Sequence, residues 1–135
     1  MGIKEWIETE NGILLELIVF VLGGIAYGAR EILFRGYTHW TMVLTGGACI
    51  LTFYLLSDWM MSMPLVAAAL VGAAIITLYE FSVGYIVNVR LGWDVWDYSR
   101  EKFNVMGQIC PMFSLVWFSL SFTWLGAIRV IRLFL

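Results

Sequence analysis

The stretch Asn88–Gln108, NVRLGWDVWDYSREKFNVMGQ, lies between two strongly apolar runs and holds six of the chain's charged residues. The whole chain has only eight Lys and Arg and ten Asp and Glu among its 135 residues. The six charges cancel, and Trp93, Trp96, Tyr98 and Phe103 stand among them. Aromatic side chains beside charges are typical of a membrane–water interface. Two interpretations remain open: an interfacial connector, or a polar re-entrant segment that would need protein or water around its backbone.

The rest of the chain is apolar enough to indicate a membrane protein. Hydrophobic residues make up 61% and charged residues 13% of the 135 residues, more than a soluble domain of this length can bury. The net charge of −2 comes without a run of Lys or Arg, so nucleic acid is not expected as a partner. Cys49 and Cys110 both fall in apolar segments, where buried thiols are expected rather than a disulfide or a metal site.

Four apolar segments predict the architecture. We expect an all-α membrane protein, a single integral membrane domain in which the stretch Asn88–Gln108 connects the third helix to the fourth. The expected spans are residues 13–34, 40–56, 65–87 and 112–128. Residues 1–12 are expected to form a short interfacial segment. Because the first span lacks a small-residue cleavage site, we expect it to be retained rather than removed as a signal peptide.

Ionisable residues inside these spans are candidate functional residues, because a charge within a bilayer is costly. Glu80 lies about 12 Å before Asn88 at about 1.5 Å per residue, too deep for a short side chain to reach water easily. It either makes a structural hydrogen bond to a neighbouring helix or serves as a coupling or substrate-binding carboxyl. Arg30 and Glu31 lie near a span end, where an interfacial ion pair is the simpler interpretation. His39 is the only histidine, and a lone loop histidine is seldom a metal ligand.

Four spans would bring the scattered polar residues to one side of the membrane, because the loop Arg35–His39 and the stretch Asn88–Gln108 must then lie on the same side. We expect one polar cavity there, with Glu80 and Asp97 facing it together and the Asn104 amide holding the Asp97 carboxylate. No catalytic residue, metal ligand or cofactor is assigned to it. The expected lining residues are Glu31, Arg35, Glu80, Asp94, Asp97 and Asn104.

The distribution of basic residues favours the cytoplasm for this side, because cytoplasmic loops are richer in Lys and Arg. Five basic residues lie on it and three on the other: Arg30, Arg35, Arg90, Arg100 and Lys102 against Lys4, Arg129 and Arg132.

Small residues predict how the helices associate. Close packing in lipid relies on small side chains, since water supplies no hydrophobic drive between helices there. Ala69, Ala73 and Gly84 share one helix face, and Gly107 and Ser114 share another. We therefore expect a homo-oligomer assembled through one of these faces.

A series of residues gives the chain a family resemblance. It consists of Arg35-Gly36, Glu80-Phe81, Leu91-Gly92, Trp96-Asp97-Tyr98-Ser99, Phe103-Asn104, Gly107 and Ile109-Cys110. In order and spacing it resembles the putative ABC-transporter type IV membrane proteins of bacteria, although Asn88 and Asp94 depart from the pattern, which more often has Glu and Arg there. The resemblance implies a place in the bacterial cytoplasmic membrane. Because no Walker A sequence is present, it also implies that this chain could at most be a membrane component beside a separate ATPase.

Three functions remain open. The first is to bind or translocate a small solute or ion, surrounded by membrane lipid, as a homo-oligomer or as the membrane component of a transporter. The second is an intramembrane enzyme or metal-binding protein that uses the Glu and Asp cluster, although no recognisable catalytic motif supports it. The third is an accessory or structural membrane subunit. The solute is not identified by the sequence.

Overall fold

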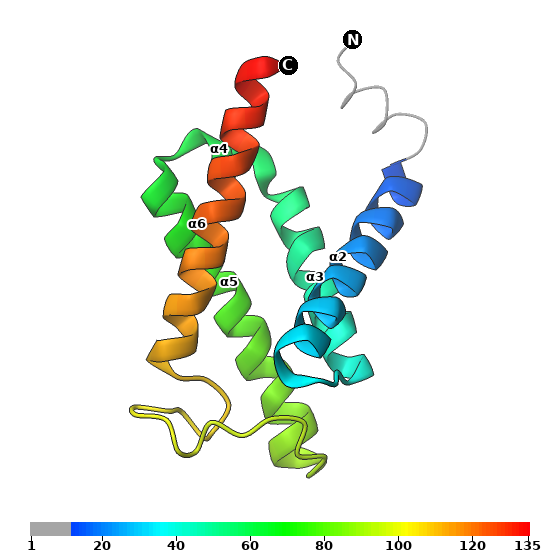
Figure 1. Cartoon of the computed structure of the whole chain (residues 1–135), viewed down its shortest axis with the longest axis vertical. Helices are drawn as coiled ribbons and strands as arrows, with labels where there is room; N and C mark the ends of the chain where they lie inside the picture. The colour runs from blue at the N-terminus through cyan, green and yellow to red at the C-terminus, as the bar shows by residue number, and fades with distance from the viewer. Residues whose placement is uncertain (1–11) are drawn as a thin grey trace. The chain divides into compact units, whose positions relative to one another are not determined.

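A computed structural model describes residues 12–135, and most of this range is helical (Figure 1). The elements in order are α2 (Gly12–Arg35), α3 (Trp40–Leu55), α4 (Ser57–Ser62), α5 (Leu65–Gly84), the π-helical turn η1 (Tyr85–Arg90) and α6 (Pro111–Phe134). Within residues 12–135 there is no β-strand, only an isolated bridge between Val105 and Ile109. The predicted all-α class is confirmed. The expected interfacial segment, apart from Gly12, lies outside the described residues.

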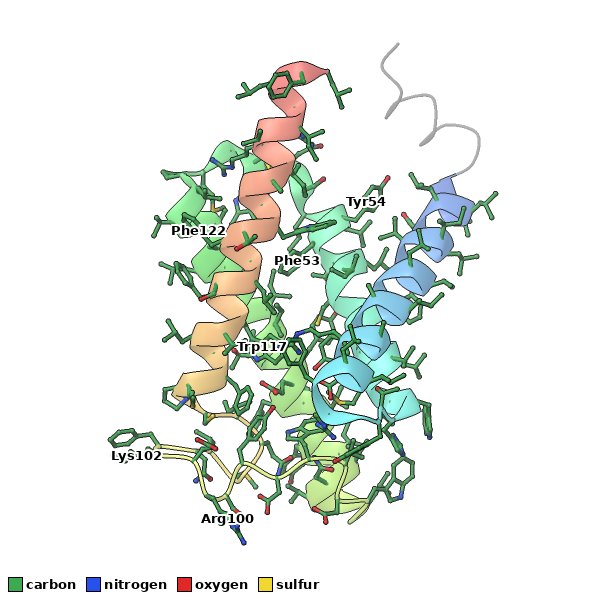
Figure 2. All side chains as sticks on the ribbon, viewed as in Figure 1. Phe53, Tyr54, Arg100, Lys102, Trp117 and Phe122 are labelled. Carbon is green, nitrogen blue, oxygen red and sulfur yellow. The ribbon has the colours of Figure 1, made fainter. Side chains whose placement is uncertain are left out.

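In the described part of the chain, three helices are long and apolar enough to cross a membrane: α2, α5 together with η1, and α6. Large apolar side chains stand exposed along all of them (Figure 2), as a lipid-facing surface requires. The second predicted span differs, because α3 has only 16 residues. At about 1.5 Å per residue it is about 24 Å long, less than the roughly 30 Å of a hydrocarbon core. Four full-length spans therefore stay a prediction.

The helix boundaries differ from the prediction at two places. A turn at Leu56 is followed by the short helix α4, which lies between the second and third predicted spans. Met63 is then extended before Pro64, which is the N-cap of α5. A residue before proline avoids the helical conformation, which explains why α4 ends there. At the other end, α6 continues to Phe134, well past the predicted end at residue 128. Its Arg129 donates to the carbonyl oxygens of Met63, at 2.6 Å, and Met60, at 3.3 Å, so this side chain caps α4 rather than only reaching for water.

The chain forms two compact units that divide after Leu55, and the first holds α2 and α3 packed through glycine. A Cβ atom on Gly47 would lie 2.7 Å from the Phe20 carbonyl oxygen, and one on Gly24 would lie 2.8 Å from the Val43 carbonyl oxygen. No rotamer change relieves a clash with backbone, so only glycine allows this helix approach.

In the second unit α5 and α6 lie side by side (Figure 1), with a hydrogen bond of 2.9 Å between the hydroxyls of Thr77 and Ser114. The segment 91–110 joins them and is called the connector. It packs directly on α5, because a Cβ on Gly84 would lie 2.6 Å from Gln108 Oε1 and 2.7 Å from Trp96.

This packing concerns the faces predicted for self-association, which itself stays a prediction. Gly84 is covered by the connector, and a Cβ on Gly107 would lie 3.0 Å from the Asp97 carboxylate. Ala69 and Ala73 are buried, and the half-buried Ser114 bonds to α5. Most of the small residues proposed for contacts between copies are thus buried within the chain. Small side chains favour close approach in either case, and the sequence does not say which helix makes it.

Candidate functional site

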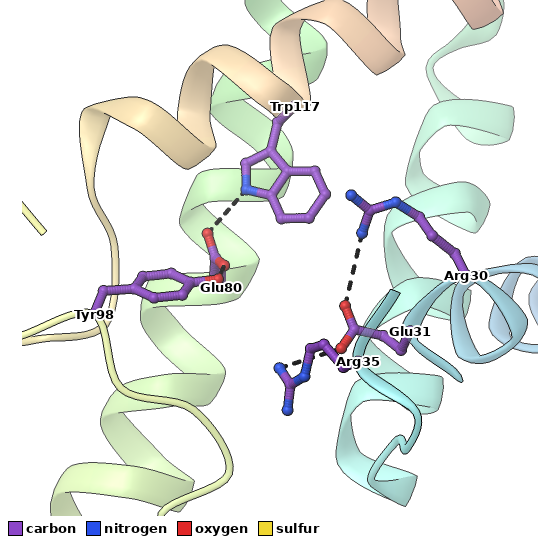
Figure 3. A network of polar contacts seen from close by, with 6 residues as sticks. All are labelled: Arg30, Glu31, Arg35, Glu80, Tyr98 and Trp117. Carbon is purple, nitrogen blue, oxygen red and sulfur yellow. Dashed lines mark hydrogen bonds and ion pairs between the residues drawn. The ribbon is translucent and has the colours of Figure 1, made fainter. Parts of the chain in front are cut away.

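The Glu80 carboxylate is buried in α5, with 4% of the residue exposed. Its Oε1 atom accepts a hydrogen bond of 2.7 Å from the Tyr98 hydroxyl, and Oε2 accepts one of 3.0 Å from the indole Nε1 of Trp117 (Figure 3). Tyr98 belongs to the connector and Trp117 to α6. One carboxyl therefore links three segments of the second unit. The prediction that Glu80 turns inward agrees with this arrangement.

The geometry of the two helices explains the pairing of Glu80 with Trp117. Side chains on a helix lean toward its own N-terminus. Glu80 lies one turn nearer the connector than Thr77, and Trp117 lies one turn farther from it than Ser114, so the two long side chains lean toward each other. The Tyr98 ring is held in place separately, because it stacks on Phe113 with ring centroids 4.4 Å apart and planes at 8°.

Two amide side chains, those of Asn88 and the buried Gln108, hold the connector against η1. Asn88 donates from Nδ2 to Gln108 Oε1 at 2.8 Å, while its own Oδ1 accepts the backbone N–H of Val95 at 2.7 Å. The Trp96 indole donates to the Gln108 carbonyl at 3.0 Å, and Gln108 Nε2 donates to the Met106 carbonyl at 2.9 Å. The connector is therefore irregular in shape but well supplied with hydrogen bonds, as backbone near a membrane requires.

Asn104 has a different role from the predicted one. Its Nδ2 donates to the carbonyls of Ser99, at 3.2 Å, and Glu101, at 2.9 Å, and its Oδ1 accepts the Gly107 N–H at 2.9 Å. All three partners are backbone groups. Asn104 thus folds the loop of the connector and does not bond to the Asp97 carboxylate, because the loop's backbone groups take up the amide.

Asp97 is exposed and is held by the residue two places on. Its Oδ1 accepts the Ser99 backbone N–H at 2.8 Å, and its Oδ2 accepts the Ser99 hydroxyl at 2.9 Å. These bonds, with a smaller contribution from Arg100, lower the pKa of the Asp97 carboxyl from its ordinary value of 3.8. In an extended segment successive side chains point to opposite faces, so Trp96 and Tyr98 turn inward while Asp97 turns outward. The structure pairs Glu80 with Tyr98 and does not bring Asp97 into that contact.

Asp94, the other connector carboxyl, is exposed too, in a left-handed backbone conformation with φ of 51°.

The first unit holds a second buried carboxyl, Glu31, with 6% of the residue exposed. Arg30 Nη1 lies 3.6 Å from Glu31 Oε1, and Arg35 Nη1 lies 3.2 Å from Oε2 (Figure 3). The Arg35 guanidinium also covers the Tyr37 ring, 4.6 Å from its centroid. An ion pair between Arg30 and Glu31 was expected because both lie near a span end, and Arg35 adds a second arginine to it. The expectation that Glu31 and Arg35 share a cavity with Glu80 concerns two separate units and stays a prediction.

The remaining candidate ligands take local roles. His39 Nδ1 accepts the Thr41 backbone N–H at 3.3 Å at the start of α3, and Cys49 and Cys110 are buried thiols. Among the described residues no group of three or more His, Cys, Asp and Glu could hold a metal ion.

The sequence profile of the putative ABC-transporter type IV family matches residues 10–133, which is nearly the whole chain. The chain belongs to this family. Comparison with curated proteins found no match, and neither did comparison with solved structures. Its family and its three long apolar helices fit a membrane protein with a role related to transport.

In this member of the ABC-transporter type IV family, the motif residues of the connector are mostly those that fold it and dock it on α5. Trp96 and Tyr98 point inward to bond Gln108 and Glu80, and Asn104 and Gly107 bond each other. The sequence interpretation missed Trp117 as a partner of Glu80. The signal was present, because Trp117 lies three residues after Ser114 on a helix face already marked by small and polar side chains.

Proposed function

We propose that this chain is a membrane component of a transporter and binds or translocates a small solute or ion, as a homo-oligomer or beside a separate ATPase subunit. Membership of the ABC-transporter type IV family supports the transport role. Because this sequence contains no Walker A motif, the proposal places ATP hydrolysis in a separate subunit. The single observation that carries the proposal is the buried carboxyl of Glu80 with its two donors.

Hydrogen bonding alone does not require an acid at position 80. A glutamine could accept the Trp117 N–H with its carbonyl oxygen and donate an amide N–H to the Tyr98 hydroxyl oxygen. An acid adds the ability to carry a negative charge, which is expensive to bury in an apolar helix. Ionisable groups kept at such positions commonly serve an ion or solute pathway. We therefore assign to Glu80 a cation, either a proton or a metal ion, that accompanies or forms the transported species.

A pathway would need more than one chain of this size. Transport sites usually form at interfaces between repeats or subunits, and few helices enclose little volume. Most of the small residues first suggested for self-association are covered within the chain, so the oligomer we propose would use the exposed apolar faces of α2, α5 and α6 instead. In this proposal the chain crosses the bacterial cytoplasmic membrane several times, with the connector on the cytoplasmic side.

Thermal unfolding in a mild detergent tests the role of Glu80. Wild type and Glu80→Gln are heated in sodium, potassium, magnesium or calcium chloride, and each series is repeated from pH 5 to pH 9. A bound ligand at one hundred times its dissociation constant stabilises by about 2.7 kcal/mol. We expect one cation, or the proton, to stabilise wild type and to lose that effect in Glu80→Gln.

Glu16→Gln is the matched control, because Glu16 also lies within a long apolar helix and the substitution again replaces a carboxyl with an amide. Glu31 is less suitable as a control, because it is paired with Arg30 and Arg35. The Glu16→Gln variant should keep the wild-type response. An identical response in wild type and Glu80→Gln would show that Glu80 binds no cation and would leave it a structural hydrogen-bond acceptor.

A further inference from the structure

Two large apolar residues of the connector stand exposed in an unfavourable backbone conformation. Phe103 is 85% exposed with φ of 59°, and Met106 is 54% exposed with φ of 55°. Among the described residues only Asp94 shares a positive φ without being glycine. Left-handed backbone is disfavoured for bulky side chains, and so is apolar surface in water. Strain of this kind persists only where surrounding structure fixes it, and it commonly marks a functional contact.

The surrounding hydrogen bonds do fix it. The Asn104 side chain holds three backbone groups of the loop around Phe103. Residues 105–108 form a tight turn with Met106 and Gly107 at its centre, closed by a bond of 3.0 Å from Gln108 N to the Val105 carbonyl. The two apolar side chains are therefore presented outward by a rigid loop rather than left there by a loose one.

The base of this loop is tied close to the membrane-spanning part of α5. Tyr98 N donates to the Gly107 carbonyl at 2.7 Å, and the Tyr98 hydroxyl reaches Glu80, well before the end of η1. Residues 99–106 must run out from that base and return to it. At roughly 3.3 Å per residue, the tip of the loop lies at most about 13 Å from the base. Figure 2 shows Lys102 at the tip, reaching sideways past the lower end of α6. Relative to the axis of α6 the loop thus points sideways, beside the end at which the helix begins.

Basic side chains flank the apolar ones. Arg100 and Lys102 are both exposed and lie on either side of Glu101, immediately before Phe103. A cationic rim with an aromatic residue beside it suits the boundary between lipid headgroups and acyl chains.

We propose that residues 100–106 form a lipid anchor, in which Phe103 and Met106 enter the headgroup–acyl boundary and Arg100 and Lys102 bind phosphates of anionic lipids. The sideways direction of the loop favours lipid over a soluble protein partner, which would need the tip to project away from the membrane. The anchor would hold the connector level with the membrane surface while Tyr98 engages Glu80. This inference rests on the membrane embedding included in the proposed function.

Spin-label accessibility tests the anchor in nanodiscs. Phe103→Cys is labelled in a chain that keeps Cys49 and Cys110, whose burial should leave the unsubstituted chain nearly unlabelled. Collisions with oxygen, which concentrates in lipid, are compared with collisions with a water-soluble nickel chelate. The ratio of oxygen collisions to nickel collisions at residue 103 should be several-fold higher than at the control Asp97→Cys. Asp97 is an exposed connector residue whose side chain points away from the inward-facing Trp96 and Tyr98.

One further sample makes each outcome decisive. A label at Leu78, which is 66% exposed in the middle of the span Leu65–Arg90, reports whether the helix itself lies in lipid. A water-accessible label at Leu78 would overturn the membrane embedding, whereas a lipid-exposed Leu78 with a water-accessible residue 103 would overturn the anchor alone. A label at 103 that neither reagent reaches would also overturn it, in favour of a protein contact.

The charge requirement is tested by lipid composition. With one third phosphatidylglycerol in place of pure phosphatidylcholine, residue 103 should become less accessible to the nickel chelate. That difference should be lost in the variant Arg100→Gln, Lys102→Gln. An equal difference in this variant would refute phosphate binding by these two side chains.

Discussion

The hydrogen bond between Tyr98 and Glu80 should be measurable as a charge-dependent contribution to the stability of the second unit. The Tyr98→Phe substitution removes only the hydroxyl, at 2.7 Å from Glu80 Oε1, and keeps the ring stacked on Phe113. A hydrogen bond to a charged group contributes about 1.5–3 kcal/mol, and one between neutral groups about 0.5–1.5 kcal/mol. Tyr98→Phe should therefore cost about 2 kcal/mol if Glu80 carries a charge.

A double-mutant cycle separates charge from contact. In the Glu80→Gln background, Tyr98→Phe should cost only about 1 kcal/mol, so the coupling energy between positions 80 and 98 should be about 1 kcal/mol. Free energies of unfolding come from dodecyl sulfate titration in mild micelles, followed by far-ultraviolet circular dichroism. Tyr85→Phe is the control, because Tyr85 is partly exposed and its ring only stacks on Phe81.

A Tyr98→Phe variant that is no more destabilised than Tyr85→Phe would refute a stabilising hydrogen bond between Tyr98 and Glu80. If Tyr98→Phe is destabilising but shows no coupling to position 80, the contact exists but Glu80 carries no charge. The main argument for a cation at Glu80 would then be lost.

Three further predictions follow from the packing and from the pKa of one connector carboxyl. Gly47→Ala should destabilise the first unit by about 1–3 kcal/mol, because the new methyl group meets the Phe20 carbonyl and forces α2 and α3 apart. Arg129→Gln should cost about 1.5–3 kcal/mol in the second unit by removing charged hydrogen bonds to the end of α4; both losses are read by dodecyl sulfate titration. Ser99→Ala should return the pKa of Asp97 toward 3.8, measured by carboxyl carbon shifts in a pH titration. Since the folded pKa is lowered, the stabilisation it reflects is present above pH 3.8 and lost as the pH falls through the folded value.

Each of the three has a control. Gly126→Ala adds the same methyl group where the nearest atom, in Leu65, is 3.6 Å away, so it should be neutral or stabilising. Arg132→Gln removes an exposed charge of the same helix and should change little. For Asp97, a pKa that is the same in wild type and Ser99→Ala would contradict the assigned cause, and equal stability differences between the two at pH 2 and pH 7 would contradict the linkage.

The sequence predicted the helices well because apolar runs of membrane length have few alternatives. The first span, the third span and the start of the fourth agree with the structure within a few residues. The second span agrees as well, since α3 ends one residue before the predicted limit, but composition alone does not reveal the short α4 that follows. The end of α6 was underestimated, because Arg129 follows the predicted limit at residue 128 although a helix continues readily past charged residues at an interface.

Of the candidate site, the sequence predicted the buried carboxyl but not its hydrogen-bond partners. Glu80 stood out because a carboxyl in an apolar helix must find donors, and it does. The sequence predicted that Glu80 faces a cavity shared with Asp97, and the structure gives it Tyr98 and Trp117 as hydrogen-bond partners. To predict Tyr98 as a partner of Glu80, one would have to recognise a short extended segment in which alternate side chains face inward. That alternation is hard to recognise here, because bends and turns interrupt the connector on both sides of the segment.

The connector also shows how polar character is distributed between its two faces. Neutral amide, hydroxyl and indole groups make the inward contacts, through Gln108, Tyr98 and Trp96. Its charged side chains are mostly exposed, and Asp97 is stabilised locally by Ser99. Neutral groups satisfy backbone partners at a lower desolvation cost than ions do, so this division lets an irregular segment lie against α5 without burying its own charges. Glu80 is then the carboxyl enclosed beneath the connector, where it accepts hydrogen bonds from Tyr98 and Trp117.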